Sequence, residues 1–182
     1  MKATPNYSKK FCLFFIVIVT VMMTTLPAMA QRGDDTNRLS KNGKTEGVVD
    51  GVDTVLEYGR PKVKGREIWG GLVPYDKVWR TGADEATTIS FSADVMIEGK
   101  TLPKGKYALF TIPGVEKWII IFNKTAQQSG AFGYDESQDA LRVEVVPESG
   151  AHVEEMTFII KDSSIVLVWE KLSISIDIAA VS

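Results

Sequence analysis

The hydrophobic residues of this chain recur in short β-type runs separated by turn residues, and no helical period extends beyond a single turn. Residues 172–178 alternate Leu or Ile with Ser or Asp, as in a strand that has one face in water. Residues 117–123, KWIIIFN, carry β-branched and aromatic residues on both faces, which indicates a central strand covered on both sides. Without interleaved helices, such strands predict an all-β fold: a single antiparallel β-sandwich or barrel-like domain.

We expect about nine strands, because turn residues recur at short and regular spacing. They cover residues 52–58, 87–92, 94–98, 106–112, 117–123, 141–146, 153–161, 165–170 and 172–178. One long irregular connection separates the first two strands. Its helical candidates are single turns at residues 66–69 and 76–79.

The candidate site lies in a polar, aromatic and glycine-rich segment, residues 58–88. Strands need only alternating hydrophobicity and turns, so the charged and aromatic residues of this segment need a separate reason. We interpret the segment as a polar and aromatic groove. Its candidate ligand-binding residues are Arg60, Arg66, Trp69, Tyr75, Trp79, Arg80, Asp84 and Glu85.

Two interpretations of these residues stay open. Guanidinium groups bind carboxylates or phosphates at two points, and aromatic rings stack on planar ligands or sugars. Alternatively, the arginines pair with Asp84 and Glu85, and the aromatic residues fasten the segment to the core. Arg80 is the sharpest ligand-binding candidate, because Gly82 lets the backbone approach a ligand closely. Trp118 and Trp169 lie among apolar strand residues, where we expect core positions.

The N-terminus has the parts of a secretory signal peptide. Basic residues precede an apolar stretch over residues 11–23, and the small-x-small sequence Ala28-Met29-Ala30 follows. The stretch is short for a bilayer span, so we expect cleavage after Ala30, which removes residues 1–30. Cys12, the only cysteine, leaves with them. We expect an exported protein, periplasmic or extracellular, with no membrane span after cleavage.

The remaining chain is interpreted as a leader and one domain. Residues 31–46 are polar and lack periodicity, which predicts a flexible leader. Residues 47–182 have the size of one ordinary domain, the expected β-sandwich. Without residues 1–30 the chain keeps 18 Lys and Arg against 23 Asp and Glu, a net charge of −5. This balance argues against nucleic acid and anionic lipid surfaces as partners.

Common catalytic and cofactor-binding sequences are absent. The chain has no Gly-x-Ser-x-Gly sequence, and its one histidine, His152, has no second histidine to share a metal. Its glycine pairs lack the lysine and helix of a phosphate-binding loop. We expect no metal and no cofactor. Asp84 and Glu85 remain as a weak acid-base pair, because adjacent strand residues point to opposite faces.

Three quoted stretches carry a family resemblance. RPKVKGREIWGGLVPYDKVWRTGADEATTISF at residues 60–91, DVMIEGKTLPKGKYALFTIPG at 94–114 and KWIIIFNK at 117–124 resemble the bacterial family known as domain of unknown function 2911. The resemblance extends from about residue 58 to about residue 178. It implies an exported protein of Bacteroidetes-type bacteria and supplies no mechanism. Two departures stand out: Asp84 where the family often has Asn, and Ser129 where it often has Trp.

The function is therefore expected within three classes. The first is a non-catalytic envelope module that binds a small ligand or an envelope protein in the groove over residues 60–85. The second is a hydrolase acting on carbohydrate or cell-envelope material, with Glu85 or Asp84 as acid or base and Arg80 orienting the substrate. The third is a structural protein that assembles through an exposed strand edge.

Overall fold

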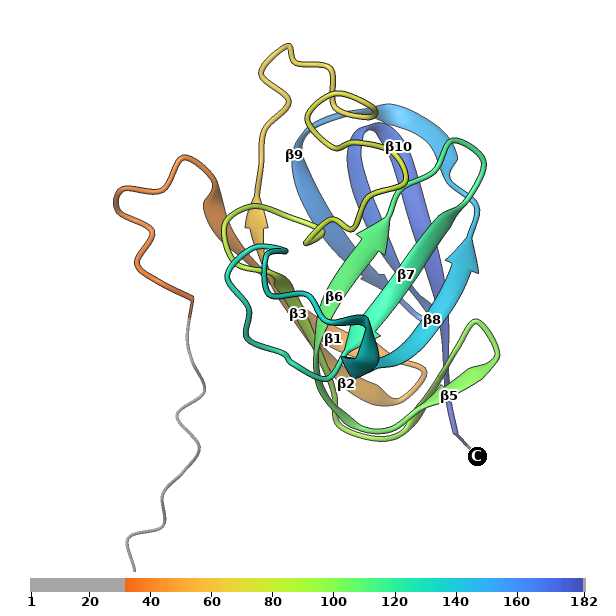
Figure 1. Cartoon of the computed structure of the whole chain (residues 1–182). Helices are drawn as coiled ribbons and strands as arrows, with labels where there is room; N and C mark the ends of the chain where they lie inside the picture. Colours follow the sequence, from red (N-terminus) through yellow and green to blue (C-terminus); the bar gives the residue numbers. More distant parts are fainter. Residues whose placement is uncertain (1–31, 182) are drawn as a thin grey trace, which may run out of the picture.

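The computed structural model describes residues 32–181, so the expected signal peptide lies outside the described residues. Ten strands form two antiparallel sheets in this part of the chain, as expected for an all-β sandwich (Figure 1). The strands are β1 (Lys41–Val49), β2 (Val52–Arg60), β3 (Thr87–Phe91), β4 (Val95–Ile97), β5 (Lys100–Leu102), β6 (Gly105–Ile112), β7 (Trp118–Asn123), β8 (Asp139–Val145), β9 (Glu148–Lys161) and β10 (Ser164–Ala180). A single 3-10 turn, η1 (Glu136–Gln138), is the helical element of these residues.

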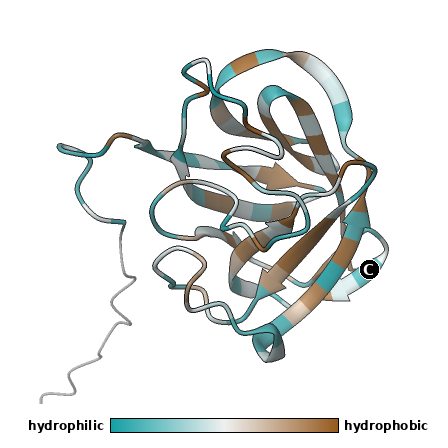
Figure 2. Ribbon diagram, turned by 45° about the horizontal axis from the view of Figure 1, so that its top comes forward, coloured by the Kyte–Doolittle hydropathy of each residue, from teal (hydrophilic) through white to brown (hydrophobic). Residues whose placement is uncertain are grey.

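The larger sheet has the order β1-β2-β3-β6-β7-β8, and the smaller has the order β5-β4-β10-β9. Along one side the sheets approach each other, since the Thr45 hydroxyl of β1 donates to the Phe158 carbonyl of β9 at 3.1 Å. The main hydrophobic core lies between them, and hydrophobic bands follow the strands (Figure 2). In β10, for example, Ile174 and Ile176 are buried whereas Asp177 is exposed.

Strand β7 is covered on both faces, as its sequence predicts. Ile120 and Phe122 belong to the core between the sheets, while Ile121 packs with Ala108 and Phe110 in a second, smaller cluster. Residues 124–138, which follow β7, cover this second cluster on the outer face of the larger sheet. This segment therefore shields part of the outer face from solvent, and its residues 126–129 line a cavity there.

The structure differs from the sequence-based boundaries at the N-terminal side. Lys41–Val49 pairs with β2 along its whole length, so residues 41–46 of the expected flexible leader form a strand. Asp50 and Gly51 make the two-residue turn with φ of 45° and 80°, the left-handed pair that a tight hairpin needs. This edge strand is mostly polar, so its sequence lacks the hydrophobic alternation that predicts a strand.

Three further expectations are corrected. Residues 165–170 and 172–178 are one strand, β10, with register shifts around Glu170, whose φ is 55°. The three-residue strand β5 pairs with β4 and was not expected. The single helical turns expected at residues 66–69 and 76–79 do not form; those residues make turns and isolated bridges instead. No helix within residues 32–181 is long and apolar enough to cross a membrane.

Candidate functional site

The long connection, residues 61–86, crosses one end of the two sheets and is fixed by backbone hydrogen bonds (Figure 1). Trp79 and Thr111 exchange two of them, at 2.7 and 2.9 Å, which attaches the connection to β6. The Val63 amide donates to the Glu154 carbonyl of β9 at 2.8 Å. The segment is irregular because it bonds to strands of both sheets, β6 in the larger and β9 in the smaller, and these hydrogen bonds fix its backbone.

All four tryptophans of the sequence meet beneath this connection. Trp69 lies edge-to-face against Trp118 and Trp169, with ring centroids 5.0 and 5.6 Å apart. Trp79 stacks on Trp169 at 6.0 Å and 19° between the planes. Trp118 and Trp169 are fully buried, which confirms the core positions expected for them. The aromatic residues thus fasten the connection to the core, one of the two interpretations considered above.

A strained turn follows Trp79. Thr81 and Asp84 have φ of 53° and 61°, in the left-handed region. Aspartate tolerates this conformation, but the β-branched Thr81 rarely adopts it, at a cost of about 1–3 kcal/mol. Hydrogen bonds hold Thr81 in place: its hydroxyl donates to Thr111 at 3.2 Å, and its carbonyl accepts from the Thr87 hydroxyl at 2.7 Å. Strain of this kind persists only where the surroundings fix it.

A cavity of about 290 Å³, here called the basic pocket, opens between this turn and residues 61–66. Trp79 and Trp169 form part of its wall, and the exposed side chains of Leu39 and Leu72 lie at its lining. Its charged lining residues are Lys62, Lys64, Arg66, Arg80 and Asp84. Four cations and one carboxylate therefore surround one cavity of a chain whose overall charge is negative.

Arg80 is the half-buried cation of the basic pocket. Its Nε is fully buried and has no hydrogen-bond partner within residues 32–181. Arg66 instead donates to the backbone carbonyls of Val63, at 3.1 Å, and Lys62. Across the described part of the chain, none of the four pocket cations makes an ion pair. Their positive charge is free to act on a ligand.

The two acids of the predicted site pair with arginines that sequence reasoning did not consider. Glu85 contacts Arg32 at 3.2 Å and Arg38 at 2.5 Å, and Asp84 contacts Arg38 at 3.4 Å. Both arginines come from the expected leader. The hydrogen bonds from Arg38 hold the pKa of Glu85 down at about 2, so this carboxyl is ionised at neutral pH.

The structure brings together four of the eight predicted residues. The basic pocket is lined by Arg66, Trp79, Arg80 and Asp84. The other four lie elsewhere: Arg60 pairs with Glu155 at 3.2 Å, Trp69 is in the tryptophan cluster, Tyr75 packs beside Gly70, and Glu85 faces a different cavity.

Sequence reasoning missed the pocket residues Leu39, Lys62, Lys64 and Trp169. Lys62 and Lys64 could have been included from the sequence, because both are cations within the candidate segment, residues 58–88. Leu39 and Trp169 carried none, since they reach the pocket from distant parts of the chain. Asp84 and Ser129, which we expect from the sequence to depart from the family pattern, line one shallow hollow together with Arg38 and Glu85.

The described residues contain no candidate metal site that would indicate what the basic pocket binds. Within residues 32–181, no group of three or more His, Cys, Asp or Glu side chains is placed to hold a metal ion.

The fold and site define an all-β sandwich protein with a basic, tryptophan-walled pocket. The family model described as "Protein of unknown function (DUF2911)" matches residues 40–178, and the chain belongs to this family. No curated protein and no solved structure matches the chain significantly.

Proposed function

We propose that this protein is an exported, non-catalytic binding protein that holds a small organic anion in the basic pocket. The observation that carries the proposal is Arg80, a half-buried residue of the pocket lining that makes no ion pair within residues 32–181. A partly desolvated cation gains most from an anion that supplies the missing hydrogen bonds. Lys62, Lys64 and Arg66 add positive charge around the same cavity.

The rest of the lining indicates the shape of the ligand. The largely buried rings of Trp79 and Trp169 back the wall of the pocket, while the exposed side chains of Leu39 and Leu72 offer apolar surface at its lining. Exposed apolar groups next to a cationic cavity favour a ligand with a carboxylate or phosphate attached to an apolar or planar body. The strained Thr81–Asp84 turn shapes one side, and strain retained beside a pocket is typical of functional sites.

The hydrolase alternative receives less support from this geometry. A general acid must carry a proton near neutral pH, and the pKa of Glu85 is held at about 2 by Arg38. Both oxygens of Glu85 are already occupied by guanidinium groups. Asp84 and Glu85 line one open hollow together, but Arg38 lies in the same hollow and pairs with both carboxylates.

The proposal is tested by titrating the protein with aliphatic and aromatic carboxylates and phosphate esters, and with the neutral amide or alcohol of each. Tryptophan fluorescence reports binding, because Trp79 and Trp169 line the pocket. We expect the anions alone to bind, and Arg80→Gln to weaken them at least about tenfold, the equivalent of one lost charged hydrogen bond. The matched control is Lys104→Gln, an exposed cation outside the pocket. Equal binding of neutral analogues, or unchanged affinity in Arg80→Gln, would overturn the proposal.

A further inference from the structure

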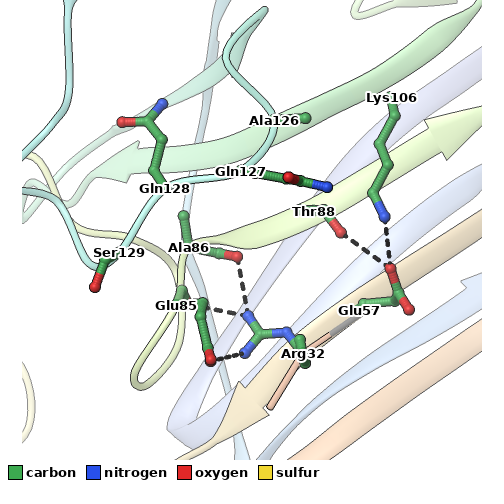
Figure 3. A pocket seen from close by; sticks show the side chains of 10 residues that line it. All are labelled: Arg32, Glu57, Glu85, Ala86, Thr88, Lys106, Ala126, Gln127, Gln128 and Ser129. Atoms are coloured by element: carbon green, nitrogen blue, oxygen red, sulfur yellow. Dashed lines mark hydrogen bonds and ion pairs between the residues drawn. The ribbon is translucent and has the colours of Figure 1, made fainter. Parts of the chain in front are cut away.

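A second cavity, of about 220 Å³, lies on the outer face of the larger sheet (Figure 3). We call it the sheet pocket. Its floor is formed by β2, β3 and the residues that precede β3, and β6 borders it, whereas residues 126–129 form its roof. It shares no lining residue with the basic pocket. Any ligand of this cavity is therefore held by a separate set of side chains.

One end of the sheet pocket carries an ion pair that spans strand β3. Lys106 of β6 donates to Glu57 of β2 at 2.7 Å, above Thr88 of the strand between them. The side chains of Lys106 and Glu57 are only 21% and 30% exposed. The hydrogen bond from Lys106 lowers the pKa of Glu57, so the pair stays charged at neutral pH.

The other end carries a second pair of opposite charges. Arg32 contacts the Glu85 carboxylate at 3.2 Å, and it donates to the carbonyls of Glu85 and Ala86 at 2.9 Å each. The Arg32 side chain is only 10% exposed. The charged groups lining the pocket are thus two cations and two carboxylates, and their sum is zero.

Hydrogen-bonding capacity remains unused between these two pairs. Lys106 donates one of its three N–H groups to Glu57. Within the described residues, Glu57 accepts hydrogen bonds at Oε2 and none at Oε1. The Gln127 side chain reaches over the cavity toward Lys106 and Thr88 (Figure 3), and its amide makes no hydrogen bond to the described chain. Free donors and free acceptors therefore face the same space.

We propose that the sheet pocket binds one ring or one short chain of a neutral polyhydroxylated compound, such as a sugar or a polyol. A hydroxyl group both donates and accepts, so it can give its proton to Glu57 and receive one from Lys106 or Gln127. A neutral ligand leaves both ion pairs intact. A charged ligand would add an uncompensated charge to a neutral, half-buried cavity or break a pair, and both are unfavourable.

The small side chains of the lining fit the same ligand class. Ala86 lies on the floor and Ala126 on the roof, and their methyl groups offer apolar contact to the C–H groups of a polyol without filling the cavity. Thr88 adds a hydroxyl to the lining, 3.5 Å from Oε2 of Glu57. This arrangement of fixed polar groups around a small apolar surface is typical of specific small-molecule sites.

The test uses NMR titration of the 15N-labelled protein with methyl glucoside, sorbitol, a neutral trisaccharide, glucuronate and glucosamine. The expected result is saturable shifts at the amides of Thr88 and Gln127 with neutral compounds only. Binding of the monosaccharide and sorbitol assigns the pocket to free small polyols, whereas binding of the trisaccharide alone assigns it to a terminal sugar of a glycan; both outcomes support the proposal. Failure of every neutral compound to saturate, or equal binding of glucuronate or glucosamine, would overturn it.

Variants locate the binding and control for folding. Glu57→Gln keeps the shape of the side chain but loses the ion pair, and we expect it to weaken neutral sugars about tenfold. Thr88→Val removes one hydroxyl and its long, 3.5 Å hydrogen bond to Glu57, but it keeps both ion pairs, so it should weaken the sugars less. The matched control is Glu144→Gln, whose carboxylate pairs with Lys117 at the same 2.7 Å but lies more than half exposed. Equal losses in Glu57→Gln and Glu144→Gln, or none in Glu57→Gln, contradict the assignment. Arg80→Gln should bind the sugars normally.

Discussion

Arg38 binds Glu85 with both terminal nitrogens, at 2.7 and 2.5 Å, although 47 positions separate the two residues in the chain. This two-point contact ties the segment before β1 to the end of the long connection. It places Arg32 in the sheet pocket and Leu39 at the basic pocket. The residues that the sequence presents as a leader are therefore part of the walls of both cavities.

The Arg38–Glu85 contact predicts a specific pH dependence of stability. Hydrogen bonding from Arg38 lowers the pKa of Glu85 from 4.5 to about 2, so the carboxylate stabilises the folded protein above pH 4.5 and loses that contribution as pH falls toward 2. Glu85→Gln should lower the free energy of unfolding at neutral pH. The gap from the wild type should then close between pH 4.5 and 2, as measured by urea denaturation.

Glu144→Gln is the control for this measurement, because its pair with Lys117 is exposed and contributes little. It should stay close to the wild type throughout the titration. A constant gap between Glu85→Gln and the wild type down to pH 2 would show that the Arg38 contact does not depend on the charge of Glu85.

A close backbone approach at Gly59 predicts a second effect. A Cβ atom at this position would lie 2.3 Å from the Ala83 carbonyl oxygen, so Gly59→Ala must push the turn before Asp84 away from β2. We expect a loss of about 1–3 kcal/mol, the usual range for overpacking, measured by urea denaturation. The added methyl should also weaken anion binding, because Ala83 and Asp84 line the basic pocket.

Gly150→Ala is the matched control for Gly59→Ala. Gly150 also lies in a strand, β9, and a Cβ there meets nothing within 4 Å. Its free energy of unfolding should differ from the wild type by no more than about 0.5 kcal/mol. Equal stability of the two variants would mean that the turn moves freely, contrary to the packing described here.

Tyr134 fastens the segment that carries the roof of the sheet pocket, and its pKa is raised. Burial and the hydrogen bond to Asp139, at 2.7 Å, raise the pKa of Tyr134 to about 12. The difference in tyrosinate absorbance between the wild type and Tyr134→Phe, followed against pH, should show that Tyr134 ionises near pH 12. In Asp139→Asn the pKa of Tyr134 should fall toward 10, because the anionic acceptor is gone. Ionisation of Tyr134 near pH 10 in the wild type would contradict the arrangement.

The fold class could be predicted because strand alternation and turn chemistry are local. Residues 117–123 indicate a strand covered on both faces, and β7 is one. Strand β1 could not be found in the same way, because it is a polar edge strand that depends on pairing with β2. The predicted strands over residues 165–170 and 172–178 leave a break at Lys171, where β10 has a register shift but does not end.

The candidate site was predictable only in part for the same reason. Arg66, Trp79, Arg80 and Asp84 lie close together in sequence, and they reach one pocket. The partners of the acids come from Arg32 and Arg38, and the pocket wall is completed by Trp169. Contacts between distant segments depend on sheet topology, which no local pattern of residues specifies.

The most direct test of the central claim observes the Arg80 side chain itself. We would follow the arginine Nε–H signals of the 15N-labelled protein by NMR during titration with the tightest-binding carboxylate, using Arg80→Gln to assign the Arg80 signal. The account predicts a saturable shift of the Arg80 Nε–H signal when an anion binds the terminal nitrogens of this guanidinium, whose buried Nε has no partner within residues 32–181. Unsaturable shifts of similar size at Arg80, Arg60 and Arg142 would contradict it, because they would mean that the anion binds the surface without using the basic pocket.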